Sequence, residues 1–83
     1  MSKTYNIDIK EMAFPKNTDV EQGDTVVWTN RMNMAHTITA DDGQFDSGVI
    51  GKDQVFSQVF KTAGTIDYHC EIHPNMVGRI SVS

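Results

Sequence analysis

The stretch from Cys70 to Met76 constrains this chain more than any other part of the sequence, because it concentrates soft metal-binding side chains. Cys70, His73 and Met76 each lie three residues from the next. Cys70 is the only cysteine, so it has no partner for an internal disulfide. One thiolate, two imidazoles and a weak thioether are the ligand set of a blue copper site. The stretch supplies one of the two imidazoles, and the second must come from elsewhere in the chain.

Two other histidines are available, and strand periodicity separates them. The residues from Thr65 to Cys70 alternate between apolar and polar, which predicts a strand whose successive side chains point to opposite faces. His69 therefore points away from Cys70 and is expected at the surface. His36 begins another β-branched segment and is the expected second imidazole. We predict that one copper ion is bound by His36, Cys70, His73 and Met76.

Other uses of a single cysteine fit the sequence less well. Structural zinc sites prefer four Cys or His ligands, and an iron–sulfur cluster typically needs four thiolates. A binuclear copper centre bridged by cysteines needs a second thiolate. A plain buried thiol and a Cys–His catalytic pair are further alternatives, but an inward thiol beside a thioether is poorly placed to meet a substrate. A full ligand set leaves no open position for substrate, so we expect an electron carrier and not an enzyme.

Charge and length narrow the classes of partner and location. Eleven acids against seven bases give a formal net charge of -4, which argues against nucleic acid, because its binding relies on Lys and Arg. No apolar run approaches membrane-spanning length. Met1–Thr4 has no apolar signal core, and we expect a periplasmic or otherwise extracytoplasmic protein whose targeting segment has been removed. Residues 1–83 are expected to form a single small domain.

The remaining pattern predicts an all-β chain. Short β-branched or alternating runs are separated by turn residues, with no convincing helix and no repeat. Seven or eight such strands predict a sandwich of two sheets. The expected strands are Tyr5–Ile9, a short one beginning at Val20, Thr25–Asn30, His36–Ala40, Gln54–Phe60, Thr65–Cys70 and Gly78–Ser83.

These segments together resemble the cupredoxins, and within them the amicyanin and plastocyanin-like group. Thr25–Asn30 is similar to the family's strand before its first histidine, Gly64–Cys70 to its approach to the cysteine, and Met76–Ile80 to its exit from the ligand loop. The spacing Cys-x-x-His-x-x-Met resembles the short ligand loop of amicyanin. The resemblance implies a Greek-key β-sandwich, a type 1 copper site and electron transfer outside the cytoplasm.

The resemblance also implies how the chain meets its partners. In related proteins the histidine that corresponds to His73 reaches the surface through an apolar patch. We therefore expect redox protein partners, for example a c-type cytochrome or a dehydrogenase, to dock there, and we expect a monomer. Two residues depart from the family pattern: Ala35 stands where Pro is common, and Thr37 where Asn is common. A hydroxyl has less reach than an amide, which bears on how the two ligand segments are linked.

A second function fits the methionines. Met12, Met32 and Met34 add three thioethers, and thioethers bind Cu(I). They favour a periplasmic protein that stores or delivers copper, whereas an apolar rim or gap filling is the simpler interpretation. A metal-free interaction domain is a third alternative, against which the four ligand residues argue.

Overall fold

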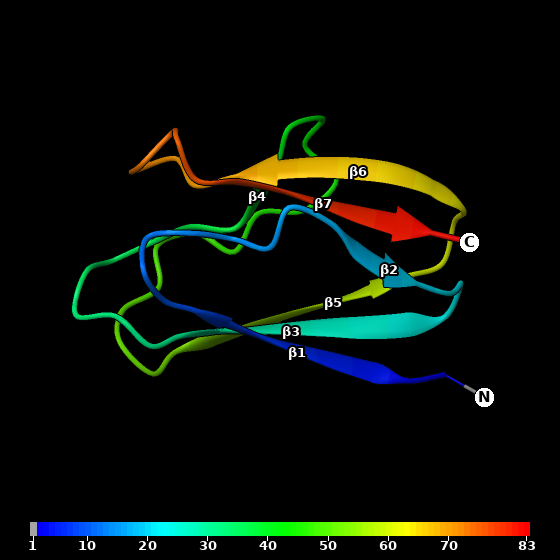
Figure 1. Cartoon of the computed structure of the whole chain (residues 1–83), viewed down its shortest axis with the longest axis horizontal. Helices are drawn as coiled ribbons and strands as arrows, with labels where there is room; N and C mark the ends of the chain where they lie inside the picture. The colour runs from blue at the N-terminus through cyan, green and yellow to red at the C-terminus, as the bar shows by residue number, and fades with distance from the viewer. Residues whose placement is uncertain (1) are drawn as a thin grey trace.

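The computed structural model describes residues 2–83, which form seven strands in two sheets and contain no helix (Figure 1). One sheet has the strand order β1-β3-β5 and the other β2-β7-β6-β4. The pairs β1–β3 and β2–β7 are parallel, and the other pairs are antiparallel. The bounds are Thr4–Ile9 (β1), Thr18–Val20 (β2), Asp24–Asn30 (β3), Thr39–Ala40 (β4), Val55–Phe60 (β5), Gly64–His69 (β6) and Val77–Val82 (β7).

Trp28 lies at the centre of the packing between the sheets. The burial of β3 alternates residue by residue, so that Val26, Trp28 and Asn30 point inward. The indole stacks edge-on against Tyr68 of β6 at a centroid distance of 5.4 Å, and its Nε1–H donates to the Tyr68 hydroxyl at 3.3 Å. Burial raises the pKa of Tyr68 to about 12. The phenolic hydroxyl therefore stays protonated, and the two sheets are joined by a neutral hydrogen bond as well as by apolar packing.

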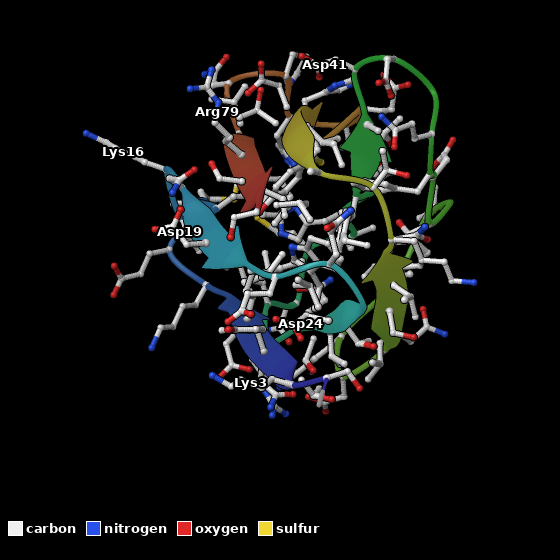
Figure 2. The ribbon with its side chains drawn as sticks, turned by 90° about the vertical axis from the view of Figure 1, so that its right-hand side faces the viewer. Lys3, Lys16, Asp19, Asp24, Asp41 and Arg79 are labelled. Atoms are coloured by element: carbon white, nitrogen blue, oxygen red, sulfur yellow. The ribbon has the colours of Figure 1, made fainter. Side chains whose placement is uncertain are left out.

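A buried carboxylate closes the end of the sandwich that carries the chain termini. Asp24, 2% exposed, accepts the backbone N–H groups of Lys3 and Glu21, each at 2.8 Å. These two bonds lower the pKa of Asp24, with the Glu21 amide as the larger cause. Figure 2 views this end of the molecule and labels Asp24 close to Lys3. The opposite end carries the Cys70–Met76 loop (orange in Figure 1), so the buried Asp24 carboxylate is well separated from that loop.

The structure confirms the all-β sandwich and corrects several of the predicted strands. Only Thr39–Ala40 of the predicted strand His36–Ala40 is paired as a strand. His36 instead forms an isolated bridge with Ile50, because the Ile38 amide donates to the Ser47 hydroxyl and interrupts the ladder. The second strand ends at Val20, where the sequence suggested that it begins. β6 ends at His69, so Cys70 is the first residue of the following loop.

Candidate metal centre

The structure brings together three of the four predicted ligand residues through two segments far apart in the sequence. His36 lies between β3 and β4, Cys70 directly follows β6, and His73 lies in the loop between β6 and β7. The donor atoms of these three residues all lie within 4.8 Å of one another. The Cys70 Sγ is 3.8 Å from Nδ1 of His36 and 3.9 Å from Nδ1 of His73. Both imidazoles therefore present the same ring nitrogen to the thiol.

These distances fit a single metal ion. A metal–sulfur bond of ~2.3 Å and a metal–imidazole bond of ~2.0 Å, the lengths found in divalent-metal sites, span about 4.3 Å when laid end to end. Both sulfur–nitrogen distances are shorter than that span. One ion can therefore join the thiolate to either imidazole, and the three donor atoms lie within 4.8 Å of one another, as a shared site requires. The donor set of one soft sulfur and two nitrogens is the set that copper prefers.

The loop that carries Cys70 and His73 is closed by its own backbone. The Met76 amide donates to the His73 carbonyl at 2.9 Å, and the Cys70 amide donates to the Met76 carbonyl at 3.0 Å. Met76 is 2% exposed, at the point where the loop enters β7. The fourth predicted ligand is thus buried at the base of the same loop. These two backbone bonds restrain the shape of the loop.

Asn30, which the sequence analysis did not single out, holds the segment around His36. Its side-chain amide donates to the carbonyls of Met34 at 2.9 Å and Ile50 at 3.1 Å, and its carbonyl oxygen accepts the Met32 amide. Ile50 in turn exchanges two backbone hydrogen bonds with His36, of 2.8 and 3.0 Å. The available sequence signal is a polar residue that ends the inward-facing row of β3. Such a residue is buried and must find partners.

Thr37 connects the His36 segment to the cysteine loop. Its backbone N–H donates to the Cys70 Sγ at 3.4 Å. Its hydroxyl accepts the backbone N–H of Glu71 at 2.8 Å. The hydroxyl therefore has enough reach to join the two ligand segments, although the family commonly carries an amide at this position.

The environment of His36 favours a neutral imidazole. The residue is fully buried, and this burial lowers its pKa, with the nearby His73 as a second cause. With Nδ1 directed at the thiol, the other nitrogen, Nε2, is buried without a hydrogen-bond partner among residues 2–83. A neutral imidazole is the form that binds a metal. The surroundings of His36 therefore suit a ligand better than a charged surface histidine.

The adjacent histidine, His69, is placed quite differently. Its side chain is 25% exposed and lies outside the donor cluster. Nδ1 bonds the Asp41 carboxylate at 2.5 Å, and Nε2 lies 3.3 Å from the Glu71 carboxylate. The Asp41 hydrogen bond is the main cause that raises the pKa of His69. The strand alternation thus correctly separates His69 from Cys70, although the side chain, which contacts two acids, is only partly exposed.

The additional methionines are spread between surface and core. Met12 and Met34 are 37% and 46% exposed. Met32 is partly buried and packs against the hydrophobic core.

Among residues 2–83, no helix has the length and hydropathy needed to cross a membrane.

Comparison with known proteins identifies the family. The sequence model of the copper binding proteins, plastocyanin/azurin family, matches residues 1–83. The chain belongs to this family. This cupredoxin is 38% identical over 87 residues to amicyanin of Paracoccus denitrificans, with 92% of the chain aligned. It is 30% identical over 83 residues to the chloroplastic plastocyanin of Physcomitrium patens, with 84% aligned.

Solved structures agree with the fold. An oxidised mutant of amicyanin superposes with a TM-score of 0.89 at 34% identity, covering 95% of this chain and 81% of that one. A Cu(I) form of a second amicyanin mutant gives the same TM-score and covers 96% and 82%. The chain spans 63% of the full P. denitrificans amicyanin sequence and 49% of the P. patens sequence. The two-sheet sandwich of this cupredoxin is therefore that of amicyanin, and copper is the metal after which its family is named.

Proposed function

We propose that this protein is a type 1 copper protein that carries single electrons. In this proposal His36, Cys70 and His73 are the strong ligands, and Met76 is the weak axial ligand. The observation that carries the proposal is a buried thiol with two imidazole nitrogens beside it, at 3.8 and 3.9 Å, in a cluster whose donor atoms all lie within 4.8 Å of one another. Copper, when bound, supplies a one-electron exchange between Cu(II) and Cu(I).

The chain's own residues suit a carrier better than an enzyme. Cys70 and His36 are fully buried, and Met76 nearly so. A thiolate, two imidazoles and a thioether occupy the ligand positions, so the site offers no place for a substrate. Backbone bonds close the loop at Met76, and Ile50 and Asn30 hold the segment of His36. A site held in this way changes little when the charge of its ion changes, which favours fast electron exchange.

We further propose that electrons enter and leave through His73. His73 is the partly exposed member of the cluster, whereas His36 and Cys70 are buried. It is followed by exposed Pro74 and preceded by Ile72, which is 45% exposed. An apolar patch around His73 brings a ligand closest to a redox partner such as a c-type cytochrome or a dehydrogenase. We place the protein in the periplasm or another extracytoplasmic compartment, as a monomer with one domain over residues 1–83.

Titration with Cu(II) tests the proposal. The wild-type protein should bind one equivalent and develop an intense visible band, because a copper–thiolate bond absorbs strongly. Cys70→Ser should fold but lose the band, since serine offers no sulfur. His69→Gln is the matched control: it changes the histidine next to Cys70 but leaves the donor cluster intact, so its band should match wild type.

Two outcomes contradict the carrier. A Cys70→Ser protein that stays strongly coloured would show that Cys70 is not the ligand. Binding of several equivalents that Met12→Leu and Met34→Leu abolish would favour copper storage or delivery.

A further inference from the structure

A chain of hydrogen bonds runs from the cysteine loop to an acid in the connection between β4 and β5. The Glu71 amide donates to the Thr37 hydroxyl at 2.8 Å, which lies 3.0 Å from the Thr39 hydroxyl. The Thr39 hydroxyl donates to the Asp46 carboxylate at 3.2 Å. Thr37, Thr39 and Asp46 are not among the predicted metal ligands. The chain therefore links the metal centre to an exposed charge.

The direction of every bond in this chain is fixed. A backbone amide only donates and an ionised carboxylate only accepts, and each hydroxyl has a single hydrogen. Thr39 gives its hydrogen to Asp46, so it accepts the hydrogen of Thr37. Thr37 then has a lone pair free to accept the Glu71 amide. The carboxylate at one end thus sets the orientation of the hydroxyl at the other.

Asp46 is itself held in place. It forms an isolated bridge with Thr39, and backbone bonds on both sides of that bridge join Ala40 to Phe45 at 2.9 Å and Ser47 to Ile38 at 3.0 Å. The same carboxylate oxygen that accepts from Thr39 also accepts the Gly48 amide at 2.9 Å. Asp46 is therefore a fixed acceptor, although its side chain is exposed.

The other end of the chain reaches the sulfur. Thr37, whose hydroxyl is oriented by Thr39, donates its backbone N–H to the Cys70 Sγ at 3.4 Å. Hydrogen bonding to the cysteine sulfur tunes the reduction potential of a copper–thiolate site. A donor withdraws charge from the sulfur and so favours the reduced ion.

We propose that Thr39 and Asp46 are positioning residues for the copper–thiolate site, acting through Thr37. They hold the Thr37 backbone in register with Cys70 and Glu71, and thereby raise the reduction potential of the bound copper. The proposal rests on the proposed copper function for its effect on potential, whereas the hydrogen-bond chain is made between protein groups alone.

Thr39→Val tests the proposal, because valine matches the shape of threonine and cannot bond to Thr37 or Asp46. In the metal-free protein, exchange of the Glu71 amide with solvent should be faster by up to about fivefold, the limit set by complete loss of its hydrogen bond to the Thr37 hydroxyl. In the copper protein, the reduction potential should fall. Thr39→Ser restores the hydroxyl and should return both values to those of wild type, which a purely steric role of the side chain would not do.

Two surface variants distinguish the hydrogen-bonding role of the Asp46 carboxylate from the effect of its negative charge alone. Asp46→Ala removes the acceptor and should reproduce the faster Glu71 exchange; being at an exposed position, it serves also if Thr39→Val does not fold. Asp42→Ala removes an equal charge from the same connection but outside the chain, and should leave the Glu71 amide unchanged. If Thr39→Val and Asp46→Ala leave the Glu71 amide and the potential at wild-type values, or if Thr39→Ser shifts them as Thr39→Val does, the proposal is wrong. A wild-type protein without the blue band would overturn the copper function and leave the exchange result standing.

Discussion

Gly78→Ala should destabilise the fold strongly, because β7 passes directly over the Tyr68 ring. Gly78 pairs with Tyr68 across the β6–β7 ladder. A methyl group at this position would lie 2.5 Å from Cζ, 2.7 Å from Oη and 2.9 Å from Cε1 of the ring. The ring has little room to retreat, since Phe14 and Trp28 pack against it at centroid distances of 4.9 and 5.4 Å. Displacing it would also break the bond from the Trp28 indole.

The expected loss in the free energy of unfolding is the difference between two opposing contributions. Overpacking a well-packed core costs about 1–3 kcal/mol. Replacing glycine by alanine recovers about 0.4–1 kcal/mol where the backbone tolerates it, by restricting the unfolded chain. The three close contacts fall on a rigid ring, so we place the packing cost at the upper end and expect a net loss of about 2 kcal/mol. For a domain of this size that loss lowers Tm by about 8–16 °C.

Urea unfolding of the metal-free protein, followed by Trp28 fluorescence, measures the loss. Gly51→Ala is the matched control, because the nearest atom to its added methyl group is 3.6 Å away, on the flexible Gln54 side chain. Its stability should stay within about 0.5 kcal/mol of wild type. If Gly78→Ala is as stable as Gly51→Ala, the contact between β7 and the Tyr68 ring is looser than described, and the reasoning fails.

Two further predictions concern the axial ligand and acid stability. Met76→Leu should keep copper bound and raise the reduction potential, because loss of a weak axial donor favours Cu(I); an unchanged or lower potential in voltammetry would show that Met76 is not axial. Two backbone hydrogen bonds lower the pKa of Asp24 in the folded protein below its value of 3.8 in the unfolded chain. The ionised carboxylate therefore stabilises the native state at pH values above 3.8. This stabilisation is lost as the pH falls through the lower, folded pKa. Asp24→Asn should therefore be less stable than wild type near neutral pH and should lose less stability on acidification; parallel pH profiles of the two proteins would contradict this.

Much of the fold was predictable because its strands carry strong local signals. The alternation of Thr65–Cys70 correctly turns Ile66, Tyr68 and Cys70 inward, and all three are buried. The β-branched run at β3 correctly predicts a strand with Trp28 in the core. Periodicity assigns faces reliably where one face is buried and the other meets water.

The parts that were mispredicted or missed depend on contacts distant in sequence. His36–Ala40 has the composition of a strand, but Ser47 competes for the Ile38 amide and breaks the ladder. Parallel pairing of β1 with β3 has no local signature. The local sequence around Asn30 and Asp46 indicates only an ordinary strand end and an ordinary turn. Their roles depend on distant partners: Asn30 bonds to the Ile50 carbonyl, and Asp46 accepts from the Thr39 hydroxyl. A sequence can predict that a buried polar group needs a partner, but not which one it finds.

The donor geometry, finally, is a consequence of folding. His36 and Cys70 are 34 residues apart, and they belong to segments fixed independently: the first by Ile50 and Asn30, the second by the backbone bonds of its own loop. Thr37 then ties the two segments together at the sulfur and at Glu71. Because these bonds are made by the chain itself, the entropy cost of gathering the ligands is met when the sandwich forms. The bound ion therefore needs to move the ligand side chains very little. A change in the charge of the ion should also shift them little, which is the property that the proposed carrier requires.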